Sequence, residues 1–165
     1  MKIRKAVITA AGWGTRFLPA TKAQPKEMLP LLNKPIIQYA VEEAVASGME
    51  QILIVTAMGK HSVEDHFDRS FELEHILQEK GMTDALAEVV SIGDSVDIFY
   101  IRQREQLGLG HAVLTTRDFV GEEPFVLILP DDIIISEVPA TRQLIEAFEQ
   151  RQGSILAIEE VSEER

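Results

Sequence analysis

The residues best suited to chemistry lie in one segment near the N-terminus, residues 10–30, which is rich in glycine and proline. Gly12 and Gly14 carry no Cβ, so the backbone there can turn sharply and bring its amides close to an anion. Arg16 offers a forked donor for phosphate oxygens, and Lys26 offers a compact positive charge. These residue types, at this spacing, predict a phosphate-binding loop.

The distribution of charge supports a local anion site. The chain of 165 residues has a net charge of −11, yet residues 1–34 hold seven lysines and arginines and one glutamate. An acidic protein repels anions unless basic residues gather locally, so this segment favours a bound polyanion. Lys2, Arg4 and Lys5 are expected only to flank a strand and solubilise it. The overall negative charge argues against sequence-independent binding to nucleic acid.

Composition and missing fingerprints exclude several classes of protein. The chain has no cysteine, which excludes disulfides, thiolate zinc sites and a cysteine nucleophile. A dinucleotide-binding G-x-G-x-x-G motif and a Walker loop both need a glycine at position 17, where Phe17 stands. The N-terminus resembles a first strand rather than a signal peptide, and no apolar run reaches the ~18 residues of a membrane span. We therefore expect a soluble, cytoplasmic protein with no membrane partner.

Alternating strands and helices must position the loop. Apolar, β-branched runs predict buried strands at residues 5–10, 51–56, 96–101, 125–129 and 154–160. Helical patterns lie between them, at residues 35–47, 60–91, 110–119 and 139–152. Strands that alternate with helices predict an α/β fold, with a mostly parallel sheet covered on both faces.

Such a sheet brings separate polar residues to one edge. Ligands of parallel sheets bind at the carboxyl ends of the strands, near the switch in strand order. This rule places the first loop on the same rim as Asp131, which follows the fourth strand. Asp131 could bind a hard cation or be only a solvated turn residue. The four histidines lack the H-E-x-x-H spacing of a zinc site, and we interpret them as helix-surface or packing residues.

The longer string around the loop is more specific than its glycines. The pattern G-x-G-T-R-x-x-P-x-T-K, followed by P-K-E-M-L-P, resembles the signature of the sugar-nucleotide pyrophosphorylases, which are nucleoside-triphosphate transferases. Within that group, the segments NKPIIQYAVEEAVASG, RQREQLGLGHAV and EEPFVLILPDDII are similar to the bacterial UTP–glucose-1-phosphate uridylyltransferases. The resemblance implies a Rossmann-like three-layer α/β/α nucleotidyltransferase fold. Residues 1–165 would form its N-terminal nucleotide-binding part, incomplete at the C-terminus and with exposed strand edges and apolar surface.

The resemblance also implies roles for individual residues. Arg16 would contact the β- and γ-phosphates, and Lys26 the α-phosphate and the attacking sugar phosphate. Asp131 matches the magnesium-binding aspartate of the family, and Gln103 matches its uracil-binding glutamine. Trp13 replaces a smaller residue and could cover the base or shield the loop. The nucleotide-binding positions that match are Ala11, Gly12, Gly14, Thr15, Gln103 and Gly108.

The implied activity is uridylyl transfer with Mg²⁺. A glucose 1-phosphate oxygen would attack the α-phosphorus of UTP and release UDP-glucose and pyrophosphate, with no protein nucleophile needed. Members of the family form homo-oligomers and take sugar contacts and a second metal carboxylate from their later half. Two alternatives stay open: a truncated, catalytically incompetent nucleotide-binding fragment, and a sister transferase that uses dTTP or CTP with another sugar phosphate.

Overall fold

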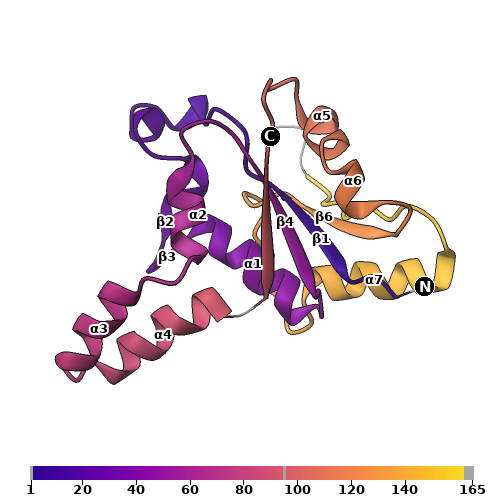
Figure 1. The fold of residues 1–165 in the computed structure, drawn as a ribbon. Helices are drawn as coiled ribbons and strands as arrows, with labels where there is room; N and C mark the ends of the chain where they lie inside the picture. The colour runs from indigo at the N-terminus through magenta and orange to yellow at the C-terminus, as the bar shows by residue number, and fades with distance from the viewer. Residues whose placement is uncertain (1, 95, 162–165) are drawn as a thin grey trace.

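Four parallel strands form the centre of the molecule (Figure 1). The computed structural model describes residues 2–94 and 96–161. The strands lie in the order β5 (Asp97–Arg102), β4 (Gln51–Thr56), β1 (Lys5–Thr9) and β6 (Phe125–Ile128). All three neighbouring pairs of this sheet are parallel. The predicted α/β fold with a parallel sheet is confirmed.

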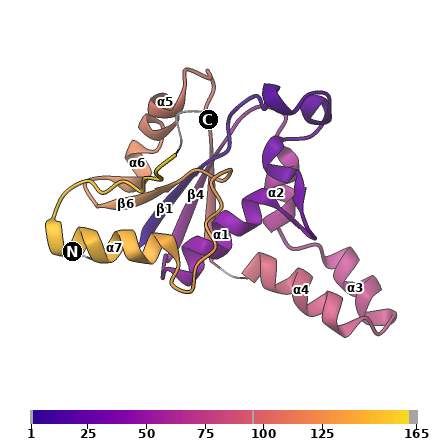
Figure 2. The same ribbon diagram turned by 180° about the vertical axis from the view of Figure 1, so that it is seen from behind.

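Successive side chains of a strand point to opposite sides of the sheet. Both faces therefore carry apolar residues, and helices cover both. Ala6 and Ile8 of β1 belong to the larger core, on the face covered by α1, α2 and α7. Val7 belongs to a second core with residues of α5 and α6 (Figure 2). The bounds are α1 (Ile36–Ala46), α2 (His61–Phe67), α5 (Leu109–Leu114), α6 (Arg117–Val120) and α7 (Ala140–Arg151).

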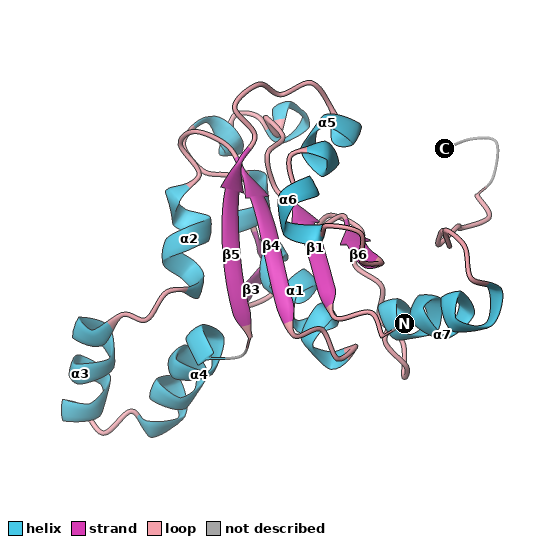
Figure 3. Cartoon of the chain, turned by 45° about the vertical axis from the view of Figure 1, so that its right-hand side comes forward, coloured by secondary structure: helices cyan, strands magenta, loops and turns pink. Residues whose placement is uncertain are grey.

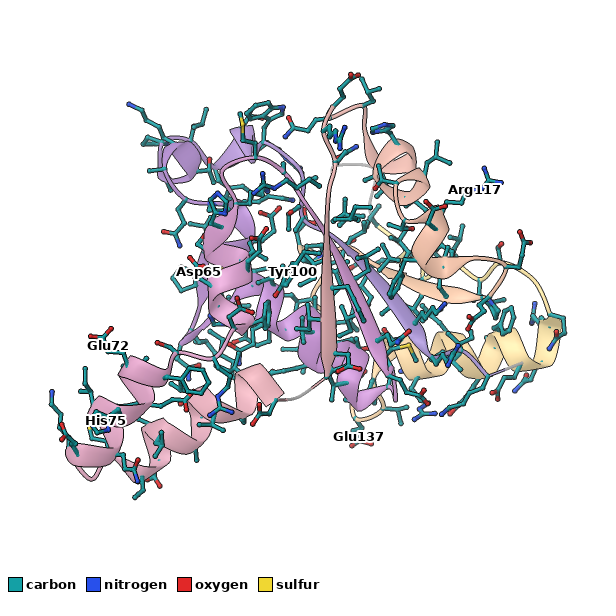
Figure 4. The ribbon with its side chains drawn as sticks, viewed as in Figure 1. Asp65, Glu72, His75, Tyr100, Arg117 and Glu137 are labelled. Carbon is teal, nitrogen blue, oxygen red and sulfur yellow. The ribbon has the colours of Figure 1, made fainter. Side chains whose placement is uncertain are left out.

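A helical hairpin projects from the sheet (Figure 3). Its helices are α3 (Phe71–Glu79) and α4 (Thr83–Asp94). Arg69 donates hydrogen bonds to both Glu74 and Asp94, which ties the two helices together at the base of the hairpin. Figure 4 places Glu72 and His75 on α3, away from the sheet and from the candidate loop.

Short elements link β1 to α1. Three turns of 3₁₀ helix come first, and a two-stranded antiparallel ribbon follows them. They are η1 (Thr15–Phe17), η2 (Ala20–Lys22), η3 (Lys26–Met28), β2 (Pro30–Leu31) and β3 (Lys34–Pro35). Across residues 2–94 and 96–161, no helix is long and apolar enough to cross a membrane.

The predicted strand over residues 154–160 is wrong. In the described part of the chain this segment pairs with no strand, and Figure 3 draws it as a loop beyond α7. A strand needs a neighbour with which to exchange backbone hydrogen bonds, and an apolar sequence alone cannot supply one. Leu156 and Ile158 are accordingly 81% and 92% exposed. Leu156 and Leu127 of β6 both line an apolar groove of about 860 Å³, so the expected apolar surface is present at this edge.

The single helix predicted over residues 110–119 is also wrong, because the chain forms two short helices there, α5 and α6. The Thr115 hydroxyl donates to the carbonyl of Ala112 at 2.6 Å, and the Thr116 hydroxyl donates to that of Val113 at 2.7 Å. Threonine hydroxyls that bond back to the preceding turn bend a helix or offer its backbone an alternative. The helical pattern in the sequence is therefore interrupted at these two threonines.

Arg4 and Lys5 do more than solubilise the first strand, contrary to expectation. Arg4 Nε and Lys5 Nζ donate to the Glu123 carboxylate at 3.0 and 2.8 Å, and Lys5 is buried. The hydrogen bond from Arg4, followed by that from Lys5, lowers the pKa of Glu123 to about 2. These bonds join the start of β1 to the segment that leads into β6.

Acid should weaken the fold through Glu123. The pKa of this carboxyl is about 2 in the folded chain against an ordinary 4.5, so its pairs stabilise the fold above pH 4.5 and lose that contribution as the pH falls toward 2. Glu123→Gln should lower the free energy of unfolding at pH 7 and flatten its pH dependence across that window. Urea denaturation at several pH values measures both effects. Glu122→Gln, at the exposed neighbour, should keep the wild-type slope; equal slopes in the two variants would contradict the assignment.

Candidate functional site

The loop after β1 folds back on itself around two glycines. Gly14 has φ +67°, and a Cβ at this position would lie 3.1 Å from Lys26 Cβ and 3.2 Å from Thr21 Cγ2. A side chain there would meet both a strained backbone and a crowded space. The Thr21 hydroxyl donates to the Gly14 carbonyl at 2.8 Å and closes the turn. At Gly12, the Cβ position would lie 4.0 Å from Lys26 Cε, so the loop sets Lys26 against both glycines.

Lys26 is brought to the carboxyl end of β6. Its Nζ donates to Asp131 Oδ2 at 2.8 Å, and the Lys26 side chain is 17% exposed while that of Asp131 is 41% exposed. Burial raises the pKa of Asp131, but the hydrogen bond and charge of Lys26, together with the charge of Arg16, outweigh burial and leave that pKa below its ordinary value. Two cations and a carboxylate predicted from separate segments therefore gather on one rim.

Gln103 lies at the carboxyl end of β5, at the other side of the same sheet. Its backbone N–H donates to the Thr56 carbonyl at 2.8 Å, which extends the pairing of β5 with β4 beyond the last strand residue. The side chain is buried, and its Nε2 lies 3.2 Å from the Gly108 carbonyl oxygen and 2.9 Å from His111 Nδ1. Gly108 has φ +92°, a conformation that favours glycine. The β1 loop lies between Gln103 and Asp131 along the strand order.

The remaining predicted positions differ in exposure. Ala11 is buried in the smaller core, where it packs behind the loop. Thr15 begins η1, and its carbonyl accepts the N–H of Leu18 at 3.4 Å. Arg16 is exposed, so its side chain is accessible to a ligand. Trp13 is 74% exposed, so its indole shields little of the loop, and covering a base is the alternative that this geometry leaves room for.

A buried ion pair beneath the loop was not predicted. Lys60 Nζ donates to Glu27 Oε2 at 2.7 Å, and the two side chains are 9% and 1% exposed. Burial lowers the pKa of Lys60, and the neighbouring Glu27 carboxylate offsets only part of that effect. Glu27 directly follows Lys26, so the pair anchors this end of the loop to the residue before α2. Nothing in the spacing of the sequence indicates the pair, because its members are 33 residues apart.

The fold and the site together indicate the class of protein to which the chain belongs. A parallel α/β sheet with a glycine-containing, basic loop at the carboxyl ends of its strands is typical of nucleotide-binding proteins. The nucleotidyl transferase family model matches residues 5–165, and the chain belongs to that family. The predicted family and fold class are therefore confirmed.

Several individual relatives are similar to nearly all of this chain. A UTP–glucose-1-phosphate uridylyltransferase of Staphylococcus saprophyticus is 58% identical over 162 residues, which are 98% of this chain and 56% of the relative. The UTP-bound UGPase of Acinetobacter baumannii is 44% identical with a TM-score of 0.87, over 92% of this chain and 54% of that one. A UDP-glucose pyrophosphorylase complexed with UDP-glucose is 45% identical with a TM-score of 0.85, over 98% and 59%. The chain thus spans about half the length of the relatives it matches.

Proposed function

We propose that this chain is the nucleotide-binding part of an enzyme that transfers the uridylyl group of UTP to glucose 1-phosphate. The observation that carries the proposal is the contact at 2.8 Å between Lys26 Nζ and Asp131 Oδ2, with the charge of Arg16 close enough to act on the same carboxylate. In this cluster the lysine and the arginine can bind a phosphate, and the carboxylate can bind the counter-ion of that phosphate. Similarity to uridylyltransferases supports UTP as the nucleotide and glucose 1-phosphate as the sugar phosphate.

The chemistry asked of the protein is positioning and charge neutralisation. Backbone amides at Gly12 and Gly14 hold the triphosphate, Arg16 neutralises the departing pyrophosphate, and Lys26 faces the α-phosphate where the sugar phosphate attacks. In the free chain Lys26 is bonded to Asp131, so substrate binding transfers its ammonium from a carboxylate to a phosphate. Gln103 and the backbone at Gly108 contact the base. No side-chain nucleophile is needed, because the sugar phosphate itself attacks.

Asp131, at this rim, fits a magnesium ion that arrives with its nucleotide. The described residues hold no group of three or more metal-ligating side chains. Mg²⁺ keeps several waters and is commonly bound through one or two carboxylates together with substrate phosphates, so Asp131 would hold it with the triphosphate. The ion would supply positive charge to the phosphates during transfer. Assembly into homo-oligomers and a cytoplasmic location belong to the same proposal and rest on the family resemblance.

Two alternatives keep the fold and change the function. The first alternative is a nucleotide-binding module without turnover; the chain spans about half the length of the relatives it matches. A sister transferase would keep the loop and the Lys26–Asp131 contact and bind dTTP or CTP instead. A preference for dTTP or CTP over UTP would distinguish the sister transferase from a uridylyltransferase. Nucleotide binding without uridylyl transfer would identify the binding module.

Thermal unfolding with a panel of nucleotides tests the proposal. With Mg²⁺ present, UTP should raise the unfolding midpoint more than dTTP, CTP, ATP or NAD. A ligand at 100 times its Kd stabilises the native state by about 2.7 kcal/mol, which corresponds to roughly 5–10 °C for a domain of this size. An equal response to every nucleotide, or a cooperative melt that no nucleotide moves, would overturn the proposal. A larger shift with dTTP or CTP would select the sister transferase.

A further inference from the structure

Three large apolar side chains lie at the carboxyl ends of three neighbouring strands. Trp13 follows β1, Met58 follows β4 and Leu107 follows β5, and they are 74%, 88% and 67% exposed. The strands are adjacent in the sheet, in the order β5-β4-β1, and the carboxyl ends of parallel strands meet at one edge. The edge that holds the candidate site therefore carries apolar surface as well as charged groups.

The fold holds Trp13 between two fixed points of that edge. Ala11, two residues earlier, is buried in the smaller core together with Ala112 of α5. Gly14, the next residue, is set against the side chain of Lys26. Consecutive Cα atoms are only about 3.8 Å apart, so the backbone of residue 13 stays on the rim between α5 and the candidate phosphate-binding residues.

The indole of Trp13 is available to a ligand. Among the described residues it enters no hydrogen bond, ring contact or cation–π contact. Gln103, on the same rim, is buried and offers a ligand the polar edge of an amide. A base that is held by its edge leaves its two flat faces exposed to water. An indole can cover one of these faces by stacking, which removes apolar surface of both rings from water.

We infer that Trp13 stacks on one face of the base while the edge of that base faces Gln103. The inference rests on the proposed function in that the ligand is a nucleotide whose base lies beside Gln103. It goes beyond the proposed function by assigning to Trp13 the binding of the face of the base. Every base has such a face, so stacking adds affinity without selecting one pyrimidine over another.

Substitutions at Trp13 test whether the nucleotide uses an aromatic face. Trp13→Leu keeps an apolar side chain but loses the ring, and the Kd for UTP should rise about 5- to 150-fold, the range that stacking on one base supports. The ratio of the Kd values for UTP and CTP should stay at its wild-type value. Inorganic tripolyphosphate has no base, so its Kd should not change. Isothermal titration in the presence of Mg²⁺ measures each Kd.

Two further variants serve as controls. Trp13→Phe restores an aromatic face and should recover most of the affinity for UTP. Phe17 is a second exposed aromatic residue of the same loop, at the end of η1. Phe17→Leu removes a ring as Trp13→Leu does and should leave the Kd for UTP unchanged. Equal losses in the two leucine variants would overturn the assignment to Trp13, because the loop would then need apolar surface in general.

Fluorescence gives a test that needs no variant. Trp13 is the single tryptophan of the chain, so the tryptophan emission reports on this position alone. UTP should quench that emission and protect the indole from quenching by acrylamide, because a stacked base covers one of its faces. Tripolyphosphate should do neither.

The outcomes separate the inference from the proposed function. If the wild-type chain binds neither UTP nor tripolyphosphate, the proposed function fails. If it binds UTP but Trp13→Leu keeps the wild-type Kd, or if bound UTP leaves the indole as open to acrylamide as before, the inference is wrong while the proposed function stands. An equal loss of affinity for UTP and for tripolyphosphate in Trp13→Leu also overturns the inference, because it places the effect at the phosphates.

Discussion

Replacing Lys26 with methionine should weaken the binding of UTP to this chain by about 10- to 150-fold. A hydrogen bond to a charged group contributes about 1.5–3 kcal/mol, and each 1.36 kcal/mol corresponds to a factor of ten. Lys26 is held in place by the fold, since its side chain is 17% exposed and its Nζ lies 2.8 Å from Asp131 Oδ2. Little ordering is then needed when a phosphate replaces the carboxylate. Isothermal titration with UTP and Mg²⁺ measures the change in Kd.

Lys22 provides the matched control for Lys26. It lies in the same loop, at the end of η2, and is exposed. Lys22→Met removes the same charge from the same segment and should change the Kd for UTP by less than about 3-fold, because exposed charges are well screened. Equal losses in the two variants would mean that the loop attracts UTP through its overall charge. An unchanged Kd for UTP in Lys26→Met would show that Lys26 does not take part in binding the nucleotide.

Much of the fold could be predicted because each strand is indicated by a local pattern in the sequence. The β-branched runs at residues 5–10, 51–56 and 125–129 appear as β1, β4 and β6 within a residue or two. The strand order β5-β4-β1-β6 could not be obtained this way, since pairing joins segments far apart in the chain. Residues 154–160 show the limit of the method: the segment has the composition of a strand, but the described chain offers it no partner.

The candidate site was predictable where one segment holds its chemistry and not where side chains meet across the fold. Gly14 could be identified because a positive φ and a tight turn demand glycine. The contact between Lys26 and Asp131 followed in outline from the rule that the carboxyl ends of parallel strands share an edge. The contact between Gln103 and His111 carries no such signal, because it depends on how α5 is placed against β5.

Replacing Lys60 with methionine should destabilise the fold by about 3–5 kcal/mol, the usual cost of removing one partner from a buried ion pair. Glu27 is 1% exposed, and its Oε1 already has no hydrogen-bond partner among the described residues. Without Lys60 the second oxygen loses its donor as well, and the carboxyl must either stay charged in an apolar setting or take up a proton. Urea denaturation measures the loss, which is a large part of the 5–15 kcal/mol typical of a domain.

Two comparisons show whether burial causes this loss. Lys2 pairs with Glu50 at the surface, with side chains 73% and 49% exposed, so Lys2→Met should leave the free energy of unfolding almost unchanged. Combining Lys60→Met with Glu27→Leu removes both buried charges and should recover much of the stability, since apolar residues can replace a buried pair at little cost. If the double variant is no more stable than Lys60→Met alone, the unpaired carboxylate is not the cause. If it recovers stability but binds UTP more weakly than wild type, the ion pair serves to hold the end of the loop that carries Lys26.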